Sequence, residues 1–205
     1  MSPIPVNLAV EDDLSESVLR RLLGFINREY HVGVTYGRNG YGYLRKTVRG
    51  WNTAARGTPF VLLTDLDSNP CPSGLIADWL GVPAHPNLIF RVAVREVESW
   101  LLADARNLAQ FLTVRQELVP GNCDDLADPK ERLVRLAKHA RSRDIRQRIV
   151  PRVGSTAKQG PDYNACLGAF VADRWDIETA CAISASLNRT VNRLRVFEPT
   201  WQQVE

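Results

Sequence analysis

The stretch FVLLTDLDSNP, residues 60–70, decides the expected fold. Its first four residues are all apolar, which is typical of a strand covered on both faces in a parallel sheet. Asp65 and Asp67 follow where the apolar run stops. Open α/β sheets bind ligands at the carboxyl ends of their strands, and alternate residues of extended chain point to the same side. The stretch therefore predicts two carboxylates at a binding edge, with a polar turn as the alternative.

Strands and helices alternate on both sides of this stretch. We expect strands at residues 6–10, 31–36, 60–67 and 87–94, and helices at 14–30, 43–57 and 71–81. Such alternation predicts an α/β fold with a mostly parallel four-stranded sheet flanked by helices.

The second half of the chain has helical patterns. We expect helices at 96–112, 129–140, 162–172 and 177–194, with a loop at 114–128. The domain organisation that follows is an α/β core at residues 1–104 and a helical, basic C-terminal extension at 105–205, packed on the core.

Cysteine spacing and hydropathy exclude several classes of protein. The four cysteines form no C-x-x-C pair and the three histidines are far from them in sequence, so a zinc site is not expected. The amino terminus has no basic flank, and no segment approaches the roughly 20 apolar residues of a membrane span. We expect a soluble, cytoplasmic protein with reduced thiols and no membrane partner.

Positive charge is concentrated late in the chain. Residues 130–160 contain ten basic and two acidic residues, a net charge of +8, whereas the whole chain carries +3. Clustered basic residues can bind the phosphates of a nucleic acid, and the candidates are Arg141, Arg143, Arg146 and Arg148. A solvated surface helix is the alternative interpretation of this stretch.

Acidic residues follow three of the four expected strands. Glu11 follows the first strand, Asp65 and Asp67 the third, and Glu96 and Glu98 the fourth. Carboxylates that converge repel one another unless a cation offsets their charge. Mg²⁺ or Mn²⁺ would do so and would support chemistry at a phosphate. An acidic cluster beside a basic helix therefore predicts phosphodiester chemistry.

Four stretches resemble a known family. The stretches AVEDDLSE (9–16) and TDLD (64–67) resemble the TOPRIM fold of topoisomerases, primases and overcoming-lysogenization-defect type nucleases. The stretches AVREVESWLLAD (93–104) and KQGPDYN (158–164) narrow this resemblance. The closest resemblance is to small stand-alone TOPRIM-like proteins of bacteria, which are suspected of roles in phage defence. The resemblance implies that Glu11 is the acid or base and that Asp65 and Asp67 are metal ligands.

The resemblance also orders the remaining candidates. Two positions along a helix rotate a side chain by about 200°, so we expect only one of Glu96 and Glu98 to face the site. Glu98 is the first choice, because TOPRIM-like relatives with one glutamate before W-L-L have it there. Related nucleases have a lysine near the end of the domain that is thought to stabilise the charge of the transition state, and Lys158 matches it by position.

The turn after the first strand departs from the family pattern V-E-G-x-[ST]-[DE]. Asp12 replaces the glycine, and one extra residue separates Glu11 from Ser15. Three acids, Glu11, Asp12 and Asp13, therefore compete for the catalytic place. We favour Glu11 because it directly follows the strand, and we expect Asp13 to cap the helix.

The function expected from these features is metal-dependent hydrolysis of phosphodiesters in DNA or RNA. The alternative is a non-catalytic nucleic-acid-binding or adaptor subunit of a partner ATPase. A phospho-acceptor receiver domain is a third alternative, because Asp12, Asp13 and Asp65 resemble its acidic residues. It needs a lysine after a fifth strand, whereas this chain continues into helices after the fourth.

Overall fold

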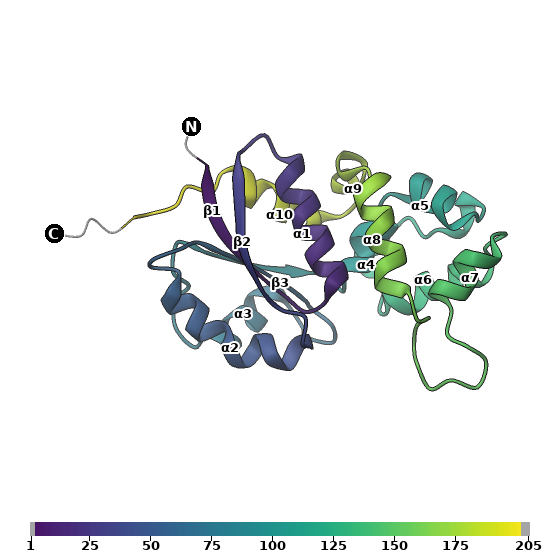
Figure 1. Ribbon diagram of the computed structural model, residues 1–205, viewed down its shortest axis with the longest axis horizontal. Coiled ribbons are helices and arrows are strands. Elements are labelled where there is room, and N and C mark those ends of the chain that lie inside the picture. Colours follow the sequence, from purple (N-terminus) through teal and green to yellow (C-terminus); the bar gives the residue numbers. More distant parts are fainter. Residues whose placement is uncertain (1–2, 202–205) are drawn as a thin grey trace.

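Four parallel strands form a sheet in the order β2-β1-β3-β4. The structure is a computed structural model that describes residues 3–201 (Figure 1). The strands are β1 (Ile4–Val10), β2 (Tyr30–Gly37), β3 (Phe60–Asp65) and β4 (Leu88–Ala93). All three neighbouring pairs are parallel, and Asp65 is level with Ala93 at the carboxyl end. The predicted parallel four-stranded α/β fold is confirmed.

Both faces of the sheet are covered by helices, as the apolar strands require. Helices α1 (Asp13–Phe25) and α10 (Ala185–Arg195) lie on one face, and α2 (Gly40–Ala54) and α3 (Pro72–Leu80) on the other (Figure 1). Alternate residues of each strand supply the two hydrophobic clusters. Val61 and Leu63 of β3 pack on the α1 side, whereas Phe60 and Leu62 pack on the α2 side.

The remaining helices gather beyond the carboxyl ends of the strands (Figure 1). They are α4 (Val97–Leu102), α5 (Ala105–Leu112), α6 (Pro129–Lys138), α7 (Arg143–Ile149), α8 (Tyr163–Asp173) and α9 (Ile177–Ile183). Two short 3₁₀ turns, Gln116–Leu118 and Cys123–Asp125, lie in the expected loop. Helix α7 occupies a segment that was not assigned to a helix from the sequence.

Two predicted helices are each divided by a capping residue. The helix expected at 96–112 is interrupted at Asp104, whose carboxylate accepts a hydrogen bond from the Asn107 N–H at 3.3 Å. The helix expected at 177–194 is interrupted at Ser184, whose hydroxyl accepts from the Leu187 N–H at 3.2 Å. The predictions of continuous helices were wrong because each residue starts a new helix by satisfying one of its free N–H groups.

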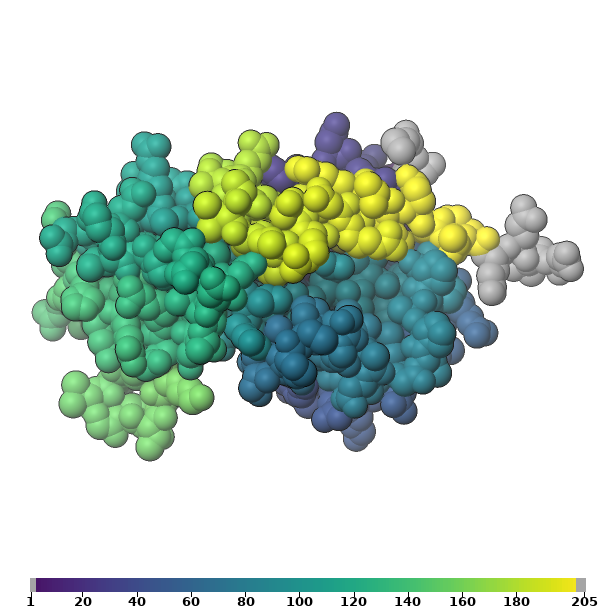
Figure 2. All heavy atoms as spheres, turned by 180° about the vertical axis from the view of Figure 1, so that it is seen from behind, coloured from purple at the N-terminus to yellow at the C-terminus, as the bar shows by residue number. Residues whose placement is uncertain are grey.

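The helical half shares a hydrophobic core with the sheet. Helix α8 packs along α1, and α10 packs beside β4. Trp100 and Trp175 are buried in the cluster that also contains Val61 and Leu63. Figure 2 shows α10 running across the rear surface of the molecule. Within residues 3–201, no helix combines the length and the apolar character needed to cross a bilayer.

Gly160 joins the loop after α7 to the start of α8. Its N–H donates to the Ile149 carbonyl at 2.8 Å. A Cβ atom at this position would lie 2.3 Å from the backbone oxygen of Arg148, whereas a Cβ at Gly42 in α2 would meet no atom within 4 Å. The close approach of two backbone segments therefore requires glycine at position 160.

We expect Gly160→Ala to lower the free energy of unfolding by about 1 to 3 kcal/mol, because the added methyl group overlaps backbone that must shift. The matched control Gly42→Ala should be neutral or stabilise by up to about 1 kcal/mol, because alanine favours a helix. Urea denaturation of the two variants and wild type measures both effects. Equal midpoints for Gly160→Ala and wild type would contradict the close packing.

Candidate carboxylate centre

Glu11 directly follows β1 and is held against the end of β3. Its Oε1 atom accepts hydrogen bonds from the Thr64 hydroxyl and from the Asp65 N–H, the latter at 3.0 Å. Burial raises the pKa of Glu11 more than these two hydrogen bonds lower it. The favoured candidate therefore lies at the predicted edge, with a carboxylate that accepts a proton more readily than an exposed one.

Asp65 is the last residue of β3, and its carboxylate connects the sheet to the helical half. Its Oδ1 atom accepts a hydrogen bond from the Val97 N–H at 2.9 Å, at the start of α4. Burial, followed by the charges of Glu98 and Glu11, raises the pKa of Asp65 well above its ordinary value. A buried carboxylate beside two other acids requires compensation by a cation or a proton.

Glu98 is the most deeply buried acid of the group, with 1% of the residue exposed. Its Oε1 atom accepts a hydrogen bond from the Tyr163 hydroxyl at 2.9 Å and lies 3.5 Å from the Lys130 ammonium nitrogen. Its Oε2 atom is buried and has no hydrogen-bond partner among the described residues. Burial raises the pKa of Glu98, and Lys130 partly offsets this rise.

Glu96 contacts the same lysine as Glu98, at its backbone. Glu96 precedes α4 in extended backbone, and its Oε2 atom accepts a hydrogen bond from the Lys130 N–H at 2.7 Å. Burial and then the charge of Glu98 raise the pKa of Glu96 to about 7. Glu96 stands at the N-cap position of α4, but its side chain makes no capping hydrogen bond. It contacts the Lys130 N–H, whereas Glu98 lies near the Lys130 ammonium group.

Lys130 is the residue that the sequence analysis missed. Burial alone would lower its pKa, but the charges of Glu98, Asp12, Asp65 and Glu96 outweigh that effect and raise it. Its ammonium nitrogen also lies 5.9 Å from the centre of the Tyr163 ring, a cation–π distance. The sequence offered no specific signal for Lys130, because it is one of ten bases in the stretch 130–160.

The other acids near β1 and β3 have different positions. Asp12 caps α1, because its carboxylate accepts a 2.8 Å hydrogen bond from the Ser15 N–H. The expectation that Asp13 is the cap was wrong. The backbone of Asp12 is extended, which brings its carboxylate to that N–H.

Asp67 is exposed and has a left-handed φ of 49°. Strand β3 ends at Asp65, so the alternation of extended chain does not reach Asp67, although its charge still raises the pKa of Glu11.

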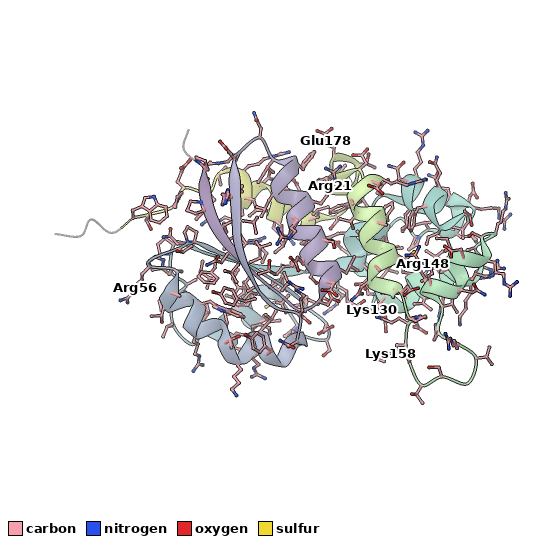
Figure 3. The ribbon with its side chains drawn as sticks, in the orientation of Figure 1. Arg21, Arg56, Lys130, Arg148, Lys158 and Glu178 are labelled. Carbon is pink, nitrogen blue, oxygen red and sulfur yellow. The ribbon has the colours of Figure 1, made fainter. Side chains whose placement is uncertain are left out.

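Two adjoining hollows lead from this group over the basic surface. The first, of about 410 Å³, is lined by Glu96, Lys130, Lys138 and the exposed Lys158, among others. The second, of about 800 Å³, lies between α7 and the loop that precedes α8, and it shares Lys138 and Pro151 with the first. Figure 3 shows Lys130, Lys158 and Arg148 around the first turn of α8 and that loop.

The four arginines expected to bind nucleic acid divide into two pairs. Arg146 and Arg148 line the larger hollow. Arg146 also donates hydrogen bonds to the carbonyls of Ala140 and Arg141. Arg141 and Arg143 are exposed and line neither hollow. The structure therefore brings Lys158, Arg146 and Arg148 to a continuous surface with Glu96.

The carboxylate centre, defined as Glu11, Asp65, Glu96 and Glu98 with Lys130, contains carboxylate oxygens, which are the donors that Mg²⁺ and Mn²⁺ prefer. Each of the four acids uses one oxygen in the contacts above, and the second oxygen makes no hydrogen bond with the described residues. Within residues 3–201, however, no three Asp, Glu, His or Cys side chains are close enough to hold a metal ion as they stand. Mg²⁺ commonly binds through one or two carboxylates, with water and substrate phosphates as further ligands.

Comparison with known proteins adds no identification: no family model, curated protein or solved structure matches this chain.

We expect the free energy of unfolding to fall between about pH 5 and 7 in the presence of a chelator. The pKa of Glu96 rises from 4.5 to about 7 on folding, so the native state binds more protons in this window and loses stability as pH increases. Glu11, Asp65 and Glu98 shift in the same direction. If the native state binds one proton more than the unfolded state, the free energy of unfolding falls by about 1.4 kcal/mol per pH unit. Glu96 is partly exposed, so we expect a smaller fall.

Glu96→Gln should make that pH dependence shallower, because a neutral amide replaces the titrating group. The control is Glu131→Gln in α6, which replaces an exposed glutamate paired with Arg135 and should keep the wild-type slope. Urea denaturation at several pH values measures both slopes. A Glu96→Gln slope equal to that of wild type would contradict the placement of Glu96.

Proposed function

We propose that the protein hydrolyses phosphodiester bonds in DNA or RNA with the help of Mg²⁺ or Mn²⁺. One observation carries this proposal: Glu11 and Asp65 follow or end parallel strands at the edge where Glu96 and Glu98 contact Lys130, and Glu96 and Lys130 line a hollow with further basic residues. The arrangement is consistent with the resemblance of the sequence to TOPRIM-like nucleases. We also propose a role in phage defence, which is suspected for those nucleases.

In this proposal, one acid transfers a proton and the others bind the cation. Glu11 would take a proton from the attacking water, because burial raises its pKa and makes its carboxylate a stronger base than an exposed one. Asp65 would hold the divalent cation, with Asp67, Glu96 or Glu98 as a second carboxylate, and water and substrate phosphates would supply the other ligands. Such a cation supplies charge stabilisation for a phosphate under attack.

The basic residues would hold the phosphates of the substrate. Lys158 and Lys138 line the hollow that contains Glu96, and Arg148 and Arg152 line the adjoining one. Lys130 is already paired with Glu98, so its main effect would be to keep the acids ionised and in place. The exposed Lys158 is better placed to reach a phosphate.

We expect wild-type protein to cut supercoiled plasmid, single-stranded DNA or RNA with Mg²⁺ or Mn²⁺, and Glu11→Gln to lower the rate by about 10² to 10⁴. Nucleic-acid binding should persist, because the amide preserves the size of the side chain. The control is Asp13→Asn, which changes an exposed residue at the start of α1 and should cut like wild type.

Calorimetry with Mn²⁺ should show that Asp65→Asn binds the metal ion more weakly than wild type does.

Two outcomes would change the assignment. Cleavage by Glu11→Gln at the wild-type rate would move the proton-transfer role to another residue. Binding without cleavage by wild type, with every nucleic acid and metal ion tested, would favour the non-catalytic or adaptor alternative.

The basic lining should determine how nucleic-acid affinity depends on salt. Arg152 and Lys158 are exposed and each lines one of the hollows. If each contacts one phosphate, Arg152→Gln with Lys158→Gln should reduce the slope of log affinity against log salt by about 1.8 for duplex DNA. Arg45→Gln with Lys46→Gln, exposed on α2, is the control and should keep the slope. Equal slopes for the two variants would place the binding surface elsewhere.

A further inference from the structure

Three arginines gather where α10 crosses β4, outside the carboxylate centre. Arg91 lies in the middle of β4 and, by the alternation of the strand, faces the same side as Ile89 and Ala93. Its Nε atom donates to the Thr190 hydroxyl of α10 at 3.2 Å. The hydrogen bond fixes the guanidinium beside the helix and leaves its two terminal nitrogens without a hydrogen bond to the described residues.

Two further arginines lie on either side of Thr190. Arg189 and Arg193 are four residues apart in α10, so they occupy neighbouring turns of one helix face. The guanidinium of Arg193 lies 5.5 Å from the centre of the Phe197 ring, a contact that orients it. Like charges at this spacing destabilise a helix, and the half-buried Arg91 adds a third positive charge.

No acidic side chain balances this cluster within the described chain. The ion pairs found between residues 3 and 201 include none of the three arginines. Burial, followed by the charges of Arg189 and Arg193, lowers the pKa of Arg91. Partly buried positive charges are normally paired, so this cluster has the electrostatics of an anion site.

A hollow of about 160 Å³ opens at the cluster, between α3, β4 and α10. Arg91 and Arg193 form its charged wall, and its other walls are mainly apolar: Ile76, Ala84, Leu88, Ile89 and Phe90. One water molecule occupies about 30 Å³ in the liquid. The hollow therefore has room for several water molecules or for a group of the size of phosphate. Figure 2 shows this side of the molecule, where α10 lies exposed along the surface.

We propose that Arg91 and Arg193, which line the hollow, and the exposed Arg189 one turn earlier in α10 form a binding site for a phosphate group. Three guanidinium groups offer planar pairs of N–H donors, which match the several oxygens of a phosphate better than the two of a carboxylate. A doubly charged anion also offsets more of the repulsion among the three charges. The phosphate comes either from free inorganic phosphate or from a terminal phosphate of a nucleic acid.

The test is binding of inorganic phosphate in the presence of a chelator, so its result does not depend on cleavage or metal binding. Wild type should bind phosphate by calorimetry, and its melting temperature should rise with phosphate relative to chloride at equal ionic strength. Arg189→Gln with Arg193→Gln should weaken binding at least about tenfold. In chloride this variant should melt no lower than wild type, because a repulsive pair is removed.

A matched control uses two arginines at the same spacing in α2. Arg45 already pairs with Asp78, and Arg49 donates to the Trp79 carbonyl. Arg45→Gln with Arg49→Gln should therefore keep the wild-type phosphate affinity.

Oligonucleotides distinguish the two sources. Tighter binding of a 5′-phosphorylated single strand than of its unphosphorylated counterpart, lost in Arg189→Gln with Arg193→Gln, supports a terminal phosphate. Equal binding of the two strands, with inorganic phosphate still bound, supports free phosphate. The proposal is overturned if wild type does not bind inorganic phosphate, or if the double variant binds it as tightly as wild type.

Discussion

The ion pair between Lys130 and Glu98 is the interaction on which the carboxylate centre depends. Glu98 is almost completely buried, and an isolated buried carboxylate would lose its charge. The ammonium group 3.5 Å away and the Tyr163 hydroxyl provide the compensation. The Lys130 backbone N–H also holds Glu96, so a single residue positions two of the four acids and offsets their charge.

The sheet supplies the other constraint. Parallel strands bring the chain ends after β1, β3 and β4 to one edge, so residues 11, 65 and 96 become neighbours although they are far apart in sequence. The contacts of Glu11 with Thr64 and Asp65 and of Asp65 with Val97 then lock this edge. A backbone N–H group donates to one oxygen of each of these two acids, and the second oxygen makes no hydrogen bond with the described residues.

The sequence predicted the parts of this arrangement that depend on local pattern. Apolar runs gave the four strands, and the acids that follow them gave the edge with Glu11, Asp65 and the two glutamates. Lys130 could not be predicted, because its position depends on how α6 packs against α4. The breaks at Asp104 and Ser184 were also missed, since each lies within a stretch whose apolar spacing continues on both sides.

The order of residues along the chain has a consequence for protein synthesis. Glu11, Asp65, Glu96 and Glu98 are all translated before Lys130, and Tyr163 follows later still. A nascent chain therefore contains every acid of the centre while it lacks both groups that contact Glu98 Oε1. During that interval the acids must stay in water or bind protons. The centre reaches its final charge state only after α6 and α8 have been made and have docked, which couples its assembly to synthesis of the helical half.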